Sequence, residues 1–407
     1  MSNRNEPVTQ TDRITSLDVL RGFALLGILM VNIQSFGLID AKYLNPTAMG
    51  ELQGMSYWSW WITFVFFDSK FMAIFSLLFG ASIGLMWQRN SQADRKPAWL
   101  HYRRMFWLLL FGLTHAHLLW YGDILFLYSI CGMTVYWLCG LKPRWLIPLG
   151  LSFVAVASGI SILIGFSLPY LDEHQMTEMI ASWSPTLNQI EENLAIYRGE
   201  WLEQLTHRSL NALFMETFLL IIWGFWRAGG LMLIGMGILK LGIFNAERSN
   251  RFYLIGTMFG LLLGLGIIIT GIGKLETANW NFEYSYFFGT QFNYWGSLFI
   301  CFAYVCIVML FCRNGWLKWL QKSLAATGQL ALTNYLLQTM VCTTLFYGHG
   351  FGWYGYLSRS QLVGVVLVFW ILQMIGSLLW LKKFRFGPFE WLWRSLSYWR
   401  LQPMLKA

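Results

Sequence analysis

The chain has 407 residues, of which 56% are hydrophobic, 18% are aromatic and only 12% are charged. A composition this apolar exceeds what one soluble core can bury, so it excludes an ordinary soluble protein and predicts an integral membrane protein. The formal net charge is +9, and the position of the basic residues along the chain decides what that excess means.

Apolar runs long enough for membrane helices, about 17 to 25 residues, recur along the whole chain. The first follows a polar N-terminal stretch without a small-residue cleavage site, so we expect a retained signal anchor. The sequence predicts an all-α polytopic transmembrane helical bundle of about ten spans, forming a single domain over residues 1–407. The expected spans are 16–38, 69–87, 104–120, 124–141, 145–168, 218–243, 251–272, 294–312, 324–346 and 361–381.

The 29 Lys and Arg residues are divided unevenly between the loops on the two sides. If both termini are inside, the expected outer loops hold few of them, namely Lys42, Arg198, Arg208, Lys274 and Arg359. The positive-inside rule therefore predicts cytoplasmic N- and C-termini, with a cytoplasmic C-terminal segment at about 382–407. The positive charge then reflects topology and gives no support for nucleic-acid binding. The expected partners are membrane lipids and a small-molecule substrate, and a homo-oligomer is left open.

One expected outer loop, at about 171–211, is long and acidic. Its apolar residues recur at spacings of three, four and seven, which is typical of amphipathic helices resting on the membrane protein. A lid over an outer opening is the alternative interpretation. Its acidic residues are Asp172, Glu173, Glu178, Glu191, Glu192, Glu200 and Glu203.

Charged side chains lie at the entrance of the first expected span. Asp18 and Arg21 precede an apolar run that then meets Asn32. A charge at or below the lipid headgroups costs a few kcal/mol, so these residues need partners or a function. The first span is therefore the expected functional helix.

Four polar residues are expected in the middle-to-outer layer of the bilayer, and a fifth is expected just above it. With a rise of 1.5 Å per residue, Asn32, His115, Asn334 and Gln338 fall at comparable depths in three spans, and Asp123 lies just above them. His115 is a candidate proton acceptor because imidazole titrates near neutral pH. The structural alternatives are interhelical hydrogen bonds for the amides and a helix cap for Asp123.

No metal site is expected. His117 lies two residues from His115 and points to nearly the opposite side of the helix, which argues against a His-x-His pair. The six Cys residues lie in or beside apolar segments and are interpreted as small core residues. The other histidines, expected at interfaces or in loops as solvated or capping residues, are His101, His174, His207 and His349.

Glu390 and Arg394, beyond the last expected span, are spaced i, i+4 and are consistent with a pair on a surface helix. Alternatively, they line a cationic entrance for a phosphorylated donor together with Arg13, Arg21 and Arg385.

Several motifs together resemble the YeiB family of bacterial inner-membrane proteins, and this resemblance implies a multi-pass protein of the inner membrane. The matching segments span the chain nearly end to end. They are 16–22 (SLDVLRG) through Asn32, 75–80 (FSLLFG), 115–125, 328–338 and 387–394 (GPFEWLWR).

The first span also resembles, more distantly, transmembrane acyltransferases of the heparan-alpha-glucosaminide N-acetyltransferase type. The shared features are a Leu-Asp-x-x-Arg-Gly entry and a membrane Asn that matches Asn32. This resemblance implies acetyl transfer from cytoplasmic acetyl-CoA to an acceptor on the far side. The family's catalytic His follows that Asn, whereas residues 33–44 contain no His, so His115 is the candidate substitute.

Two functions follow from these expectations. The first is an acyltransferase using acetyl-CoA or another acyl-CoA as donor, with His115 tuned by Asp123 as general base and Asn32 and Asn334 as oxyanion donors. In this hypothesis no tightly bound cofactor is expected. The alternative is a transporter or exporter of a small polar solute that uses the same polar layer.

Overall fold

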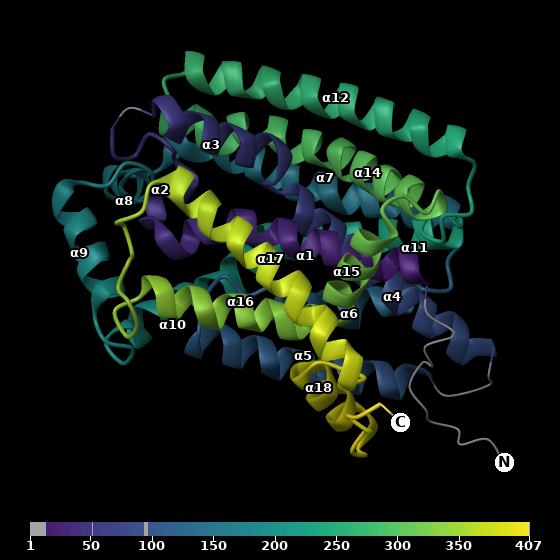
Figure 1. Cartoon of the computed structure of the whole chain (residues 1–407). Coiled ribbons are helices and arrows are strands. Elements are labelled where there is room, and N and C mark those ends of the chain that lie inside the picture. The colour runs from purple at the N-terminus through teal and green to yellow at the C-terminus, as the bar shows by residue number, and fades with distance from the viewer. Residues whose placement is uncertain (1–13, 51, 93–96, 407) are drawn as a thin grey trace.

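The computed structural model describes residues 14–50, 52–92 and 97–406, and these residues form a helical bundle (Figure 1). In the described residues, the only β-pairing is an isolated bridge between Phe384 and Leu405. The predicted all-α polytopic fold is therefore confirmed. The first helices are α1 (Thr15–Gly37), α2 (Asp40–Leu44), α3 (Gly54–Phe66), α4 (Lys70–Gln92), α5 (Pro97–Leu118) and α6 (Leu125–Val135) with the 3-10 turn η2 (Tyr136–Leu138).

The remaining helices continue in the same pattern of long apolar segments and shorter connecting helices. They are α7 (Pro143–Ser167), η3 (Leu168–Tyr170), α8 (Glu173–Trp183), α9 (Leu187–Arg198), α10 (Gln204–Phe214), the π-helix η4 (Met215–Gly224), α11 (Phe225–Lys240), α12 (Asn250–Thr277), α13 (Phe282–Tyr284), the π-helix η5 (Ser285–Gly289), α14 (Thr290–Arg313), α15 (Lys318–Gln329), α16 (Ala331–Phe346), α17 (Arg359–Lys383) and α18 (Pro388–Tyr398).

Seven helical segments of the described chain are long and apolar enough to cross a membrane. The apolar helix 125–138 is too short for that criterion, and Leu330 divides the expected span 324–346 between α15 and α16. All ten expected spans are helical over most of their length, but the number of crossings and the location of the termini stay predictions. Residues 171–211 hold α8, α9 and the first part of α10.

Helix α1 occupies the centre of the bundle (Figure 1). In its most apolar window 83% of the residues are buried, against 22% for α7, α12 and α17, which are therefore peripheral. Helix α1 packs closely against α15. A Cβ added to Gly22 would lie only 1.9 Å from the backbone oxygen of Leu324. On the opposite side of the contact, a Cβ on Gly328 would lie 2.0 Å from the oxygen of Asp18.

Helices α8 and α9 lie at one end of the bundle and α18 lies at the other (Figure 1). We call these the α9 end and the α18 end. The positive-inside prediction corresponds to an α18 end in the cytoplasm and an α9 end outside.

Candidate functional site

The centre of the candidate site is a buried pair formed by His115, near the end of α5, and Asp123, in the turn before α6. Their Nδ1 and Oδ1 atoms are 2.8 Å apart, and the side chains are 1% and 2% exposed. The second carboxylate oxygen of Asp123 accepts a hydrogen bond of 2.6 Å from the backbone N–H of Phe126, in the first turn of α6. The carboxylate therefore holds the imidazole and caps α6 at the same time.

The other imidazole nitrogen of His115 faces a hydroxyl group. Nε2 lies 2.9 Å from Oγ1 of Thr339, a buried residue of α16. With the proton on Nδ1, beside the carboxylate, Nε2 is left as an acceptor for that hydroxyl. The order carboxylate, imidazole and hydroxyl is the order found in catalytic triads, in which the imidazole acts as a general base.

Aromatic rings surround this imidazole. The ring of Tyr335 has its centroid 5.2 Å from that of His115, and the ring of Trp120 stands nearly perpendicular at 6.4 Å. The indole N–H of Trp120 is buried and has no hydrogen-bond partner among the described residues. It is therefore a free donor next to the pair.

Asn32 lies on the face of α1 that points toward this region. Phe36, one turn further along α1, has its ring 4.3 Å from that of Trp120, and Ser35 lies 3.4 Å from the hydroxyl of Tyr121. The spacings of three and four residues put Asn32 on the same helix face, where it is half-buried.

Asn334 and Gln338 instead join α16 to α17. The amide of Asn334 donates to Ser377 Oγ at 3.0 Å, and the amide of Gln338 donates to Gln373 Oε1 at 2.9 Å. Gln373 in turn donates to the backbone oxygen of Asn334 at 3.0 Å. These hydrogen bonds link the two helices, as in the structural interpretation of the two amides.

Asp18 and Arg21 form an ion pair of 2.8 Å within the first turns of α1. Arg21 also donates to Ser82 of α4 at 3.3 Å, and its side chain stays 26% exposed. Arg394 lies on α18, with its guanidinium 4.7 Å from the ring centroid of Phe386. Arg21 and Arg394 are thus engaged by different neighbours, Arg385 is exposed, and Arg13 lies outside the described residues.

Glu390 is buried on α18 and contacts the first turn of α16. It accepts hydrogen bonds from the backbone N–H of Thr333 at 3.0 Å and from its hydroxyl at 2.5 Å. Burial raises the pKa of Glu390, and the hydrogen bonds from Thr333 oppose that rise. Glu390 is therefore an N-terminal partner of α16.

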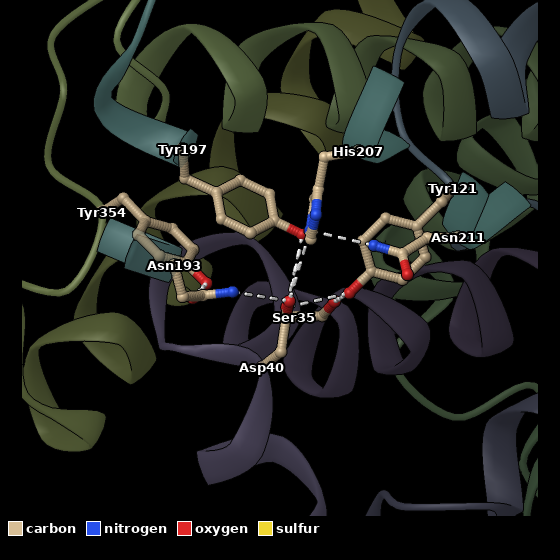
Figure 2. Close-up of polar contacts among 8 residues, drawn as sticks. All are labelled: Ser35, Asp40, Tyr121, Asn193, Tyr197, His207, Asn211 and Tyr354. Carbon is tan, nitrogen blue, oxygen red and sulfur yellow. Dashed lines mark hydrogen bonds and ion pairs between the residues drawn. The ribbon is translucent and has the colours of Figure 1, made fainter. Parts of the chain in front are cut away.

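A second polar centre, which the sequence did not reveal, surrounds Asp40 at the α9 end (Figure 2). Its carboxylate accepts hydrogen bonds from Tyr121 at 3.0 Å, from Asn193 at 3.0 Å and from Tyr197 at 3.2 Å. His207 of α10 approaches it, with Nε2 3.9 Å from Oδ2. We call this set the Asp40 cluster, and it comprises Ser35, Asp40, Tyr121, Asn193, Tyr197, His207, Asn211 and Tyr354.

The Asp40 cluster differs from the His115 pair in its access to solvent. The side chains of Asp40 and His207 are 33% and 30% exposed. Burial raises the pKa of Tyr121 and of Tyr197, which therefore remain protonated hydrogen-bond donors to the carboxylate. His207 was expected to be solvated or capping and is instead part of this cluster. Its members come from positions 35 to 354, so no local motif marks them.

A third polar centre is buried between α4, α11 and α14. The amide of Asn293 donates to Asp68 at 2.6 Å and its oxygen accepts from Lys70 at 2.5 Å. Arg227 donates to Ser297 at 2.9 Å and has its guanidinium 4.0 Å from the ring centroid of Tyr294. Lys70 and Arg227 are fully buried, so a carboxylate and two cations share this region.

Within the described part of the chain, no group of three or more His, Cys, Asp or Glu side chains is arranged to hold a metal ion. The six Cys residues are free and all but Cys312 are buried.

Comparison with known proteins gives near full-length similarity. The chain is 30% identical to "Uncharacterized protein YeiB" of Escherichia coli (strain K12) over 95% of the chain and 96% of the relative. It is also 30% identical to "Uncharacterized protein YxaH" of Bacillus subtilis (strain 168), over 98% of each, and 27% identical to the "Uncharacterized 39.9 kDa protein in amylase 3'region" of Bacillus acidopullulyticus, again over 98% of each. Residues 238–400 match the family described as "Protein of unknown function (DUF418)". The chain therefore belongs to the YeiB family of multi-pass membrane proteins.

Proposed function

We propose that this protein is a membrane-embedded acyltransferase that moves an acyl group from a CoA thioester to a hydroxyl or amine acceptor, with acetyl-CoA as the simplest donor. The observation that carries this proposal is the imidazole of His115, fixed on one side by Asp123 and facing a hydroxyl on the other. A hydrogen-bonded carboxylate fixes the tautomer that leaves Nε2 free to accept a proton.

The reaction needs one proton acceptor and one leaving group. Nε2 of His115 takes the proton from the acceptor hydroxyl, whose oxygen attacks the thioester carbonyl. The carbon–sulfur bond then breaks, and the proton passes to the CoA thiolate. The amide of Asn32, half-buried on the α1 face that points toward Trp120, is placed in this scheme as the donor to the oxyanion.

The hydroxyl of Thr339 occupies the position that an acceptor hydroxyl would take. Thr339 is thus a positioning residue in this scheme, which keeps Nε2 hydrogen-bonded until the acceptor arrives. The donor would enter at the α18 end, proposed to face the cytoplasm of a bacterial inner membrane, where Arg21, Arg385 and Arg394 supply positive charge for its phosphates. In this scheme Asp18 orients Arg21 through their ion pair, whereas Asn334, Gln338 and Glu390 hold the helices around the donor path.

The test is the transfer of radiolabel from acetyl-CoA into the lipid and polar fractions of membrane vesicles that contain the protein. General-base catalysis contributes about 10²- to 10⁴-fold, so His115→Gln should reduce incorporation by at least about 100-fold. Asp123→Asn should reduce it as well, because the imidazole loses its fixed tautomer.

The matched control is His117→Gln, which removes an imidazole two residues away that pairs with Glu216 at 3.2 Å. Incorporation should stay at the wild-type rate in this variant. If the folded His115→Gln variant incorporated label at the wild-type rate, His115 would not be the general base.

A second candidate is transport of a small polar solute, favoured by the buried charges Lys70 and Arg227 and the neighbouring Asp68. Ionisable groups inside a membrane domain commonly mark solute or proton pathways. Transport needs no acyl donor. Solute exchange in proteoliposomes without CoA thioesters, together with no label incorporation, would support it over the acyltransferase.

A further inference from the structure

Next to the Asp40 cluster lies a buried cation whose hydrogen-bonding capacity is largely unused. Arg208 of α10 is 4% exposed, and its Nε donates to the backbone oxygen of His117 at 2.7 Å. Its Nη1 and Nη2 atoms are buried and have no hydrogen-bond partner among the described residues. A buried guanidinium with two free nitrogens is costly unless an acceptor is present for them.

A second unused donor lies against the Asp40 cluster. The hydroxyl of Tyr347 is also buried without a partner in the described chain. Tyr347 follows α16, and its ring packs against the rings of Tyr197 and Tyr354 in the Asp40 cluster. Its ring centroid is 5.1 Å from that of Tyr197, which in turn lies 5.4 Å from the ring of His207. The two free donors therefore adjoin the Asp40 cluster.

The face of α10 explains how these groups come together. Gln204, His207, Arg208 and Asn211 follow the spacing i, i+3, i+4 and i+7, which places them on one side of the helix. Gln204 is anchored by donating to the backbone oxygen of Gly199 at 2.8 Å, and its own side-chain oxygen has no partner in the described residues. Asn211 lies 3.0 Å from Nε2 of His207.

The arginines at this end donate hydrogen bonds to neutral acceptors. Arg198 donates to the backbone oxygen of Tyr354 at 2.8 and 3.0 Å, and Arg359 donates to the backbone oxygen of Lys42 at 2.7 Å. Within the described residues, no carboxylate lies within ion-pair distance of Arg198, Arg208 or Arg359. Asp40 is the carboxylate of the Asp40 cluster, and α8 and α9 at the same end carry further acidic residues. The two unpartnered nitrogens of Arg208, and not an excess of positive charge, therefore favour an added anion.

We propose that the Asp40 cluster, together with Arg208 and Tyr347, is a binding site for an oxyanion that carries a neighbouring hydroxyl group, as in a glycerol phosphate. Arg208 offers two N–H groups in the fork that suits a phosphate or carboxylate, and Tyr347 adds a third donor. Asp40, at the centre of the cluster, and His207 are both partly exposed and receive the hydroxyl (Figure 2).

This ligand would be the acceptor of the proposed acyl transfer, and only that role rests on the proposed function. The two centres are neighbours through Trp120 and Tyr121, whose rings face His115 and the Asp40 cluster respectively. An acceptor held at the Asp40 cluster would therefore lie on the α9 side of the His115 pair.

The test is calorimetric titration of the purified protein in an uncharged detergent with glycerol 3-phosphate, without an acyl donor. We expect saturable binding that is weakened about tenfold or more by Arg208→Gln, since each hydrogen bond to a charged group is worth about a factor of ten. Tyr347→Phe should also weaken binding, and it removes no hydrogen bond of the protein, so misfolding does not confuse the result. The matched control is Lys274→Gln, which removes an exposed cation on α12.

The source of the ligand is decided by a second arm in nanodiscs. Stabilisation by phosphatidylglycerol relative to phosphatidylcholine, lost in both variants, would assign the site to a lipid headgroup; binding of glycerol 3-phosphate alone would assign it to a soluble compound. The proposed site would be rejected if neither glycerol 3-phosphate nor phosphatidylglycerol bound, or if Arg208→Gln bound as well as the wild type. Binding without acetyl transfer would retain the site and reject the acyltransferase.

Discussion

At the scale of single residues, Tyr347 gives the sharpest prediction for the protein without ligand. Its hydroxyl is buried and unpartnered, so Tyr347→Phe should raise the stability of the ligand-free protein by about 1 kcal/mol. The matched control is Tyr354→Phe, which loses a hydrogen bond of 2.8 Å to Asn193 and should lower stability by a similar amount. Thermal unfolding in detergent measures both, and a lower midpoint for Tyr347→Phe would contradict the account.

The residues of the two polar centres differ in how far the sequence could reveal them. His115 and Asp123 are eight positions apart across one turn, so their proximity was accessible from the sequence. Thr339 was not, because its contact with His115 depends on how α16 packs. The Asp40 cluster was inaccessible for the same reason, since Asp40, Tyr121 and His207 meet only through tertiary packing.

At the scale of helices, the contact between α1 and α15 depends on the absence of side chains. Gly22→Ala should destabilise the protein by about 1–3 kcal/mol, because the new Cβ meets the backbone of Leu324 and the helices must separate. The control is Gly266→Ala on α12, where no atom lies within 4 Å of the added Cβ and stability should hold or rise. Equal unfolding midpoints for the two variants would argue against the close approach.

The start of α16 gives a prediction that depends on pH. Because the folded state raises the pKa of Glu390 above the ordinary value of 4.5, it holds this proton more tightly than the unfolded state. The stability from this residue is therefore fully present below pH 4.5 and is lost as pH rises through the folded pKa.

The measurement compares the unfolding midpoints of the wild type and Glu390→Gln as pH rises from 4.5. The advantage of the wild type should shrink over this range, because the Gln variant carries no ionisable group there. Glu390→Ala should be destabilised at every pH by about 1–3 kcal/mol, since the N–H of Thr333 loses its partner. A difference between wild type and Glu390→Gln that does not change with pH would contradict the assignment.

The helices themselves follow the apolar pattern of the sequence, but their interruptions do not. The helix is interrupted at Leu330. Just beyond this break, the backbone N–H of Thr333 donates a hydrogen bond to Glu390, which lies on the distant helix α18. No local sequence pattern predicts this contact. The expected span 218–243 belongs to a longer helical run from Gln204 to Lys240, which the apolar pattern indicates, whereas its π-helix η4 leaves no mark in that pattern. Composition specifies that a segment is helical, whereas tertiary hydrogen bonds decide where a helix stops.

At the scale of the whole molecule, the uneven distribution of Lys and Arg predicts opposite sides for the α9 and α18 ends. A membrane-impermeant maleimide should label Glu191→Cys in intact cells and should label Lys318→Cys only after the membrane is opened. Both positions are exposed in the structure. The wild type, with five of its six native Cys residues buried, gives the background. Labelling of both variants in intact cells would reject the topology.

The central position of α1 has a consequence for how the protein is made. Helix α1 leaves the ribosome about 300 residues before α15, whose Leu324 and Gly328 pack against it beside Asp18 and Gly22. Until α15 is synthesised, Asp18 and Gly22 lack the helix that packs against them. We therefore expect α1 to be covered only when α15 packs back onto it, and a chain truncated before α15 should expose α1 to the proteases that clear unassembled membrane proteins.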